Sequence, residues 1–347
     1  MNFPRVSIII LNFNGIKDTL DCLKSLKKCA YSNFEVILVD NGSKNNEGTK
    51  LKELEVGNLR VFVNKTNLGF AGGNNFAIKR VLREGRSEYI YFLNNDTEVD
   101  PKFLAYAVER AESSQKIGIV GSLSLQFYNR DFIENAGHDF LNCGDYVPRS
   151  RNKKRGDFQK FCEVMGVCSA GALYKVETLR ECGMYDESFF LNYEDADLCM
   201  RCILYGWKCV YEPKSVIYHK LSVSVTKSRD YALNVRSQYN LLRTYFYNTP
   251  APVILFNLPF ILIRDSTVIF GTLLTGKFWI FRVFMHARMR FLCGLAVALR
   301  ERKKRMKHKK ISSWYLLKHQ KNFLNKYISY FIDFILKNKK HHYETSK

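Results

Sequence analysis

The segment VSIIILNF, residues 6–13, is apolar and rich in β-branched residues almost throughout. Three later segments share this pattern: FEVILVD (34–40), LRVFVN (59–64) and YIYFLN (89–94). Short runs of this kind are typical of strands that are buried on both faces of a parallel sheet. The four segments therefore predict the centre of an α/β domain.

Helix-like segments separate these predicted strands: DTLDCLKSLKKC (18–29), TKLKELEV (49–56) and NNFAIKRVLRE (74–84). Strands that alternate with helices form right-handed βαβ units, so we expect an open, doubly wound sheet. A sheet of this type binds its ligand beyond the carboxyl ends of its strands. The residues that follow each strand are therefore the first candidates for a functional site.

Polar segments follow all four predicted strands: NFNG (12–15), DNGS (40–43), GFAGGNN (69–75) and NNDT (94–97). Asn, Asp and Gly are common turn residues, which is a sufficient explanation for any single strand end. Four polar ends in succession favour a binding site. The glycine-rich segment lacks the GxGxxG and GxxxxGK[ST] spacings, which argues against a dinucleotide-binding protein and a P-loop ATPase.

Asp96 ends the fourth predicted strand. A carboxylate at this position can share Mg²⁺ or Mn²⁺ with two phosphates, since these cations prefer a few protein oxygens together with phosphate oxygens. The alternative is a helix start, with Asp100 and Pro101 capping a helix over 101–113. That alternative accounts for Asp100 but leaves Asp96 as a candidate ligand.

A second acidic segment, FFLNYEDADLCMRC (189–202), places Glu194, Asp195 and Asp197 directly after an aromatic run. A carboxylate at the rim of an aromatic pocket is a good general base, because partial desolvation raises its pKa. Acids also favour the first turn of a helix, here with Asn192 as the N-cap. On the residues alone, the two interpretations are about equally supported.

Six motifs occur in a fixed order along the chain: VSIIILNFNG, VDNGS, NLGFAGGNN, FLNNDTEV, SAGALYKVETLRECGMYDESFFLNYEDADLCMRCILYGW and VIYHK. Over residues 4–250 this set resembles the family-2 glycosyltransferases of the GT-A fold, most closely the rhamnosyltransferase-like branch. The resemblance implies an α/β, doubly wound mixed sheet of the nucleotide-diphospho-sugar transferase type. It also implies inverting transfer of a sugar from a nucleotide diphosphate to an acceptor hydroxyl, with Mg²⁺ or Mn²⁺ as cofactor.

The resemblance assigns donor-binding roles to residues that follow the predicted strands: Phe13, Asp40, Asn74, Asn75, Asn94, Asn95 and Asp96. Within this set, Asp40 matches the acid that holds the nucleobase and Asn95 the ribose contact. Asp96 occupies the DxD-like position and would hold the metal together with His219 of VIYHK. Two asparagines replace acids that are often found in this motif, so fewer carboxylates are present for the cation.

The same resemblance makes Asp195 the base that deprotonates the acceptor hydroxyl, with Glu194 beside it. One base without a protein nucleophile implies a single displacement and inversion at the anomeric carbon. The leading expectation for the donor is dTDP-rhamnose, and a UDP-sugar is the alternative. A sugar-phosphate nucleotidyltransferase is disfavoured, because no basic glycine-rich loop follows the first strand.

The positive charge of the chain is concentrated near its C-terminus. Residues 227–347 hold 24 Lys and Arg against 5 Asp and Glu, whereas residues 1–226 hold 30 against 28. A near-neutral body with a basic segment indicates an anionic partner, either a membrane or a nucleic acid. The ten cysteines follow no compact spacing, so we expect reduced thiols in a cytosolic setting.

We expect a GT-A catalytic domain over residues 1–250 and a basic, apolar helical extension over 251–347. The apolar segments 251–263, 266–276 and 278–299 are each interrupted before the ~18 consecutive apolar residues of a spanning helix, which favours interfacial or re-entrant helices. The following RERKKRMKHKK (300–310) is typical of attachment to an anionic membrane surface.

A further basic amphipathic helix is expected over residues 315–337. These features predict a peripheral or monotopic protein on the cytoplasmic face of a membrane, with a lipid-linked saccharide as acceptor. A nucleic-acid-binding protein is the alternative of a different class. It is disfavoured because the basic run adjoins apolar segments rather than exposed aromatic residues on a polar sheet.

Overall fold

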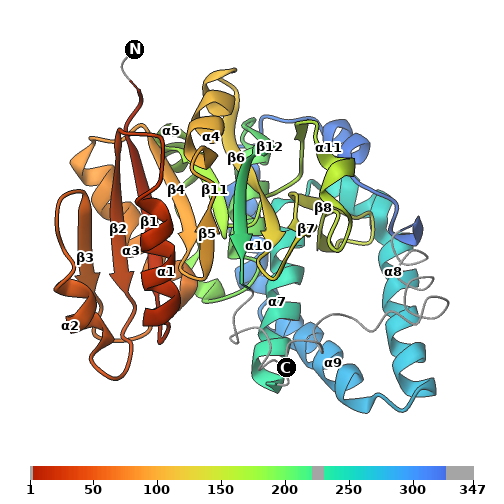
Figure 1. Cartoon of the computed structure of the whole chain (residues 1–347). Helices are drawn as coiled ribbons and strands as arrows, with labels where there is room; N and C mark the ends of the chain where they lie inside the picture. Colours follow the sequence, from red (N-terminus) through yellow and green to blue (C-terminus); the bar gives the residue numbers. More distant parts are fainter. Residues whose placement is uncertain (1–2, 221–229, 326–347) are drawn as a thin grey trace.

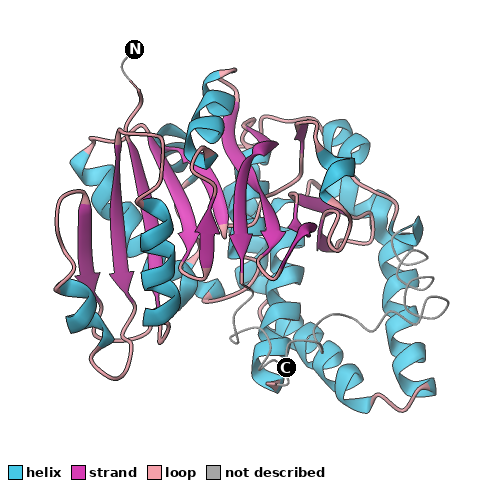
Figure 2. Cartoon of the chain, viewed as in Figure 1, coloured by secondary structure: helices cyan, strands magenta, loops and turns pink. Residues whose placement is uncertain are grey.

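The computed structural model describes residues 3–220 and 230–325 (Figure 1). Its described part is built on a ten-stranded sheet in which eight strands follow the order β10-β12-β6-β11-β4-β1-β2-β3, while β5 pairs with β12 and β7 with β6. Helices lie on both faces of this sheet (Figure 2). The doubly wound arrangement expected from the sequence is confirmed.

One half of the sheet is parallel. Its strands are β1 (Val6–Asn12), β2 (Phe34–Asp40), β3 (Leu59–Val63) and β4 (Tyr89–Asn94). The helices between them are α1 (Ile16–Leu26), α2 (Glu47–Lys52) and α3 (Gly69–Glu84). All of these elements were predicted from hydrophobic pattern, and their parallel pairing brings the polar strand ends to one edge.

The other half of the sheet is mixed. Its strands are β5 (Thr97–Val99), β6 (Ile117–Gln126), β7 (Asn129–Asn135), β10 (Cys162–Glu163), β11 (Gly171–Lys175) and β12 (Lys208–His219). Strand β11 runs antiparallel to both β4 and β6, whereas β12 runs parallel to β6. The sheet is therefore mixed, as the resemblance implied.

Alternate residues of the central strands face two separate cores, as the two-residue period of a strand requires. In β1, Ile9 packs with Ile37 on one face, while Ile8 and Ile10 pack with Leu38 on the other. Each core is closed by helices, which explains why the central strands are apolar at nearly every position.

Short elements complete the sheet domain. They are α4 (Phe103–Glu112), the hairpin of β8 (His138–Phe140) and β9 (Tyr146–Pro148), the 3₁₀ turns η1 (Arg155–Phe158) and η2 (Glu187–Phe189), α5 (Val176–Cys182) and α6 (Glu194–Leu204). The ten cysteines are free thiols, and Cys199 and Cys202 are buried in the packing of α6.

Within residues 230–325, five helices follow the sheet: α7 (Tyr231–Asn248), α8 (Ala251–Leu274), α9 (Phe278–Cys293), α10 (Leu295–Met306) and α11 (Ser313–His319). Helices α8 and α9 form an open V beside the sheet domain (Figure 1). The expected break between 251–263 and 266–276 was wrong, because α8 continues through Arg264 and Asp265. Both side chains form ion pairs, so the helix accommodates these two charged residues.

Helix α8 is the one helix in the described ranges that is long and apolar enough to cross a membrane by length and composition, with 24 residues and a mean hydropathy of 1.8. Beyond α10 the chain returns to the sheet domain. The Lys310 N–H donates to the Leu204 carbonyl at 2.8 Å, and the Lys321 N–H donates to the Phe140 carbonyl at 2.8 Å. Of the helix expected over 315–337, residues 326–337 lie outside the described part.

Candidate active site

Asp96 and His219 meet because a short strand pairs with the end of a long one. Strand β5 lies antiparallel to β12 with Thr97 opposite His219, and the Lys220 N–H donates to the Asp96 carbonyl at 2.9 Å. This register places Asp96 Oδ1 3.1 Å from His219 Nε2. The two metal ligands suggested by the resemblance, 123 positions apart, are thus brought together.

Glu134 of β7 stands behind His219 and was not found from the sequence. Its buried Oε2 lies 3.6 Å from His219 Nδ1, and its Oε1 accepts from Arg151 at 2.7 Å. Burial alone would lower the pKa of His219, but Asp96 and Glu134 outweigh it and raise the pKa to about 10. Burial likewise opposes the ionisation of Glu134, yet His219 and Arg151 hold its pKa well below the usual range.

The side chains at this position are suitable ligands for a hard divalent cation. They offer one carboxylate and one imidazole nitrogen, and Glu134 can fix the ring through the opposite nitrogen, as the outer partners of metal-bound histidines do. No group of three or more His, Cys, Asp or Glu side chains arranged for a metal occurs in residues 3–220 and 230–325. The set therefore fits a cation that also takes ligands from phosphate oxygens and water.

The two asparagines before Asp96 point in different directions. Asn94 Nδ2 lies 3.5 Å from His219 Nε2, at the edge of the same cluster. Asn95 Nδ2 donates to Thr19 Oγ1 at 3.0 Å and so faces the start of α1. Of this pair, Asn94 is the one in contact with the metal-site histidine.

The turn before Glu194 and Asp195 has an unusual backbone. Phe190, Asn192 and Tyr193 all have positive φ, at 63°, 71° and 68°. Non-glycine residues in such conformations cost of order 1–3 kcal/mol each and persist only where the surroundings impose them. The predicted N-cap role of Asn192 was wrong, because α6 begins after Tyr193 and the Asn192 amide donates to Ser237 Oγ at 2.7 Å.

Two neighbours impose this turn. The buried Asn240 amide of α7 is within hydrogen-bond distance of the carbonyls of Phe189, Leu191 and Asn192, at 2.8 to 3.1 Å. On the other side, Gly69 has φ +73°, and a Cβ there would lie 2.5 Å from the Phe190 ring. Gly69 is therefore required by the close approach of the turn to the start of α3.

Asp195 and Glu194 differ in environment. Asp195 is half-buried, and its Oδ2 accepts from the Ser169 N–H at 3.3 Å. Glu194 is buried, and burial together with the charge of Asp195 raises its pKa to about 8. Desolvation therefore acts mainly on Glu194, which leaves Asp195 as the more accessible carboxylate.

Asp197, the third acid of the segment, is a structural residue. It is fully buried and pairs with Arg201 at 3.1 Å, with Arg305 of α10, and with the Asn248 amide at 2.9 Å. Burial would raise its pKa, but the two arginines hold the pKa below its ordinary value. Arg305 belongs to the segment expected to face a membrane, yet its side chain is buried beneath the acidic helix.

His138 of β8 links the two acidic clusters. Burial lowers its pKa, while the charges of Asp195 and Glu134 both act on the ring in the opposite direction. Glu134 also contacts His219, so His138 lies within the electrostatic influence of both Asp195 and the carboxylate behind the Asp96 and His219 pair. The sequence offered no signal for His138, because it stands alone between predicted elements.

Other residues predicted to bind the sugar donor form hydrogen bonds within the protein. The Asp40 carboxylate accepts from Asn12 Nδ2 at 2.7 Å and from Ser43 Oγ at 2.5 Å. The Asn74 amide donates to the Phe70 carbonyl at 2.9 Å. Asn75 uses both amide atoms on Tyr185, accepting from its N–H at 3.1 Å and donating to its carbonyl at 2.9 Å. Their roles towards a donor stay predictions.

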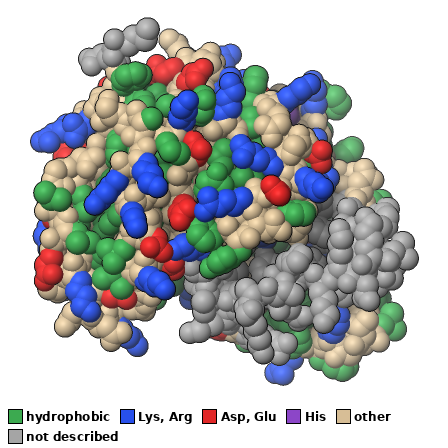
Figure 3. All heavy atoms as spheres, in the orientation of Figure 1, with side chains coloured by type: hydrophobic (Ala, Val, Ile, Leu, Met, Phe, Trp, Pro, Cys, Tyr) green, Lys and Arg blue, Asp and Glu red, His purple; other side chains and the backbone are tan. Residues whose placement is uncertain are grey.

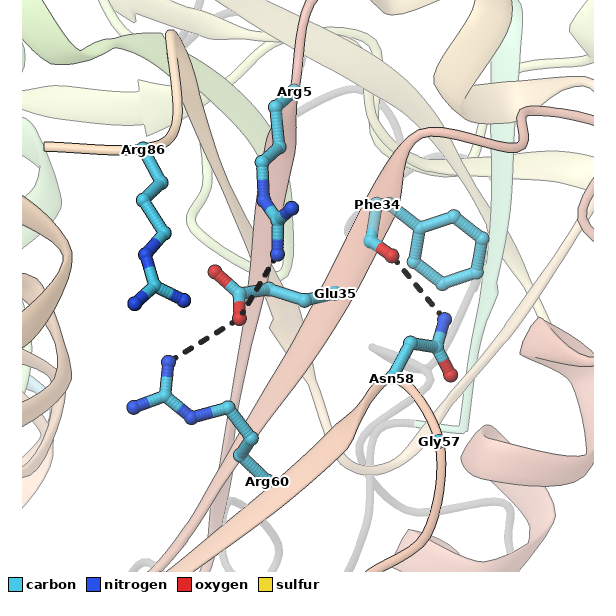
Figure 4. Close-up of a pocket in the computed structure, with 7 residues that line it drawn as sticks. All are labelled: Arg5, Phe34, Glu35, Gly57, Asn58, Arg60 and Arg86. Carbon is cyan, nitrogen blue, oxygen red and sulfur yellow. Dashed lines mark hydrogen bonds and ion pairs between the residues drawn. The ribbon is translucent and has the colours of Figure 1, made fainter. Parts of the chain in front are cut away.

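Phe13 is 45% exposed directly after β1, in position to offer its ring to a ligand. A separate cavity of about 400 Å³ lies at the opposite edge of the sheet, where Arg5 and Arg60 contact Glu35 (Figure 4). It adjoins the amino ends of β1 and β2 and none of the predicted site residues. Lys and Arg alternate with Asp and Glu over the visible face of the sheet domain (Figure 3).

Comparison with known families bears on this constellation. The model of glycosyl transferase family 2 matches residues 7–183, just over half of the chain. The chain belongs to glycosyl transferase family 2. The matched part contains Asp40 and Asp96, while Asp195 and His219 lie beyond it.

Among curated members related to this family-2 chain is dTDP-rhamnosyl transferase RfbF of Shigella flexneri, 25% identical over 214 residues. The alignment covers 59% of this chain and 65% of that protein, which is just under two thirds. Two longer relatives are spanned over 25% and 18% of their lengths. The rhamnosyltransferase-like resemblance is thus confirmed over the aligned residues.

Solved structures give the fold of this family-2 protein. GalNAc-T7 with UDP, GalNAc and Mn²⁺ has a TM-score of 0.56 and 17% identity, over 70% of this chain and 48% of that one. Mannosyltransferase PcManGT from Pyrobaculum calidifontis, with GDP-Man and Mn²⁺, has a TM-score of 0.51 and 16% identity, over 85% and 76%. These likenesses confirm the GT-A fold expected from the sequence.

Proposed function

We propose that this protein transfers a sugar from a nucleotide-diphosphate donor to a hydroxyl group of an acceptor in cell-envelope polysaccharide assembly. The observation that carries the proposal is the contact of Asp96 with His219 beyond β4, together with the place of Asp195: its partner Ser169 adjoins Ala170, whose carbonyl accepts from the Asn94 N–H at 3.1 Å. Family membership and the relative named as a dTDP-rhamnosyl transferase support the same activity. The leading donor is dTDP-rhamnose.

Asp96 and His219 are the residues that would hold Mg²⁺ or Mn²⁺ in this proposal, and the bound cation would neutralise charge on the leaving diphosphate. Glu134 orients the His219 ring from behind. Two structures with the same fold contain Mn²⁺, which supports a divalent cation. Excess EDTA should therefore stop the reaction, and added Mn²⁺ or Mg²⁺ should restore it.

Asp195 is the proposed base. Its half-buried carboxylate is held by the Ser169 N–H, so it is oriented without being neutralised by an ion pair in the described residues. From this position it would take the proton of the acceptor hydroxyl on the face opposite the leaving diphosphate. A single displacement of this kind inverts the anomeric configuration, which NMR of the product measures directly.

A panel of nucleotide sugars tests the activity. Hydrolysis without an acceptor is measured for dTDP-rhamnose, UDP-glucose, UDP-GlcNAc and GDP-mannose, each with Mn²⁺. We expect preferential cleavage of dTDP-rhamnose. Preference for a UDP-sugar would support the alternative donor, while absence of cleavage with all four would contradict the proposed reaction.

The C-terminal helices are proposed to place this site at the cytoplasmic face of a membrane that carries a lipid-linked acceptor. Helices α8 and α9 expose many large apolar side chains, among them Leu255, Phe256, Leu262, Phe270 and Phe278. Exposed Lys303, Lys304, Lys307 and Lys309 follow in or after α10. Apolar faces beside such cations fit an anionic lipid surface.

Co-sedimentation with vesicles tests this location. We expect binding to vesicles containing phosphatidylglycerol and weaker binding as salt rises. Stronger retention on RNA than on vesicles would instead favour the nucleic-acid alternative. The division at residue 250 stays a prediction, since α10 and the residues after it also pack against the catalytic body.

A further inference from the structure

A second cavity, of about 350 Å³, lies between the catalytic body and the C-terminal helices. One wall comes from the β8–β9 hairpin and the turn before α6, and the other from α7, α8 and α9. Its lining includes Tyr146, Tyr193, Gln238, Val268, Trp279 and Phe284. The volume falls in the range of small-molecule sites, which are mostly apolar with a few placed polar groups.

The turn that precedes the proposed base lines the cavity. Tyr193 is two positions before Asp195 and belongs to the strained turn that sets the direction of α6. Tyr146 packs edge-on against His138, with ring centroids 6.4 Å apart, and the charge of Asp195 acts on that histidine. A molecule in the cavity would therefore contact Tyr193, in the turn before the proposed base, and Tyr146, which packs against His138.

The ionic groups at the cavity balance one another. Arg264 pairs with Asp145 and, at 2.6 Å, with Asp265, while Arg288 pairs with Asp265 at 2.8 Å. Two guanidinium groups thus face two carboxylates. This arrangement leaves no excess positive charge for a diphosphate, so the ligand chemistry that fits is neutral.

The remaining lining groups are suited to a sugar ring. Aromatic side chains offer flat apolar faces, and sugar rings have apolar C–H faces with hydroxyl groups around them. The half-buried Gln238 amide makes no hydrogen bond within the described ranges, so it is available to hydroxyl groups. Half-exposed Trp279, at the start of α9, closes the opposite side.

We propose that this cavity binds a neutral saccharide unit of the acceptor, next to the turn that precedes Asp195. The inference rests on the proposed function and adds a location and a chemical class for the acceptor. The apolar outer faces of α8 and α9 then lie on the far side of the same helices, where a lipid anchor would enter the membrane. The C-terminal helices therefore form part of the active site.

Ligand-observed NMR on the full chain tests the proposal. The probes are methyl glycosides of glucose, galactose, rhamnose and N-acetylglucosamine, with inorganic pyrophosphate and octyl tetraethylene glycol as competitors. We expect at least one glycoside to bind, and its dissociation constant to rise about tenfold in both Gln238→Ala and Trp279→Ala. Trp314→Ala, an exposed tryptophan on α11 outside the cavity, is the matched control and should bind like the wild type.

Unchanged glycoside binding in both cavity variants would overturn the proposal, and so would displacement by pyrophosphate or equal competition by the sugar-free detergent. If Trp279→Ala does not fold, Gln238→Ala alone decides. Donor hydrolysis distinguishes a failure of the cavity proposal from a failure of the proposed transfer reaction. Trp314→Ala should hydrolyse donor like the wild type, whereas a wild type that cleaves no nucleotide sugar contradicts the proposed reaction and leaves the glycoside result to stand alone.

Discussion

The two acidic centres of this protein are built in contrasting ways. The Asp96 and His219 centre is made by regular strand pairing and holds its charges in contact with one another. The Glu194 and Asp195 centre follows three non-glycine residues of positive φ and depends on Asn240 of α7. The proposed donor centre, Asp96 and His219, thus belongs to the sheet, while the proposed acceptor centre, Glu194 and Asp195, depends on the C-terminal helices.

The largest expected effect comes from removing the base. Asp195→Asn keeps the shape of the side chain and its contact with Ser169 but cannot take a proton. General-base catalysis contributes about 10²–10⁴-fold, so kcat should fall by about 10³-fold. Donor affinity, measured by calorimetry, should stay unchanged because the donor centre is separate. Turnover close to that of the wild type would remove Asp195 from this role.

Arg305→Ala tests how far the acceptor centre depends on α10. The variant leaves buried Asp197 with Arg201 and Asn248 alone, and breaking a buried ion pair costs roughly 3–5 kcal/mol. Denaturant unfolding should show a loss of this size. Lys304→Ala, an exposed neighbour on the same helix, is the matched control and should change stability by less than about 0.5 kcal/mol.

If Arg305→Ala instead unfolds like the control, α10 contributes little to the acceptor centre, and the contrast between the centres weakens. Mn²⁺ binding provides the second readout, measured at a temperature where the variant is folded. It should match the wild type, since Asp96 and His219 lie on the sheet.

Glu194 predicts a pH dependence of stability. Its pKa is raised from 4.5 to about 8 in the folded protein, so its protonated form favours folding. That contribution is complete below pH 4.5 and is lost as pH rises to about 8, an effect of roughly 2–4 kcal/mol. Glu194→Gln should therefore lose less stability than the wild type between pH 5 and pH 9, as measured by denaturant unfolding at each pH.

The control for this pH series is Glu177→Gln, which replaces an exposed acid on α5. Its stability should follow the wild-type pH curve. Parallel curves for Glu194→Gln and the wild type would mean that Glu194 does not carry the raised pKa, and the acceptor centre would then resemble the donor centre in holding only ionised acids.

The smallest expected effect concerns the carboxylate behind His219. Glu134→Gln should weaken Mn²⁺ binding about 10–100-fold, the usual range for an outer partner of a metal-bound histidine. Electron paramagnetic resonance of free Mn²⁺ measures this without turnover. Glu212→Gln is closely matched, because Glu212 is equally buried in the same sheet and pairs with Arg110 at 2.7 Å without contacting His219. Equal Mn²⁺ affinity in both variants would contradict the role of Glu134.

The parallel half of the sheet could be predicted from the sequence because each of its strands is apolar on both faces. The mixed half could not, since β5, β7 and β11 are short or partly polar and are defined by long-range pairing. Without that pairing, nothing indicated that His219 would meet Asp96. The motif resemblance supplied the pair, and the β5–β12 register explains it.

The acidic segment was predictable as a helix start but not as a strained turn. Positive φ at Phe190 and Tyr193 cannot be inferred from residue types that rarely adopt it. The sequence likewise did not show which side chains of the basic segment 300–310 are buried. Lys303 and Lys304 are exposed as expected, whereas Arg305 is buried against Asp197, because burial of one side of α10 depends on a partner distant in sequence.

The Phe190 carbonyl accepts from the N–H groups of Phe70, at 2.7 Å, and Ala71, at 3.3 Å. These amides form the positive end of the α3 dipole, where many proteins seat a phosphate. At the start of α1, the Gly15 N–H is likewise committed to Glu47 Oε2 at 3.0 Å. With these amide donors occupied by the protein itself, the diphosphate of the proposed donor would need its counter-charge elsewhere, a role that the proposed cation at Asp96 would fill.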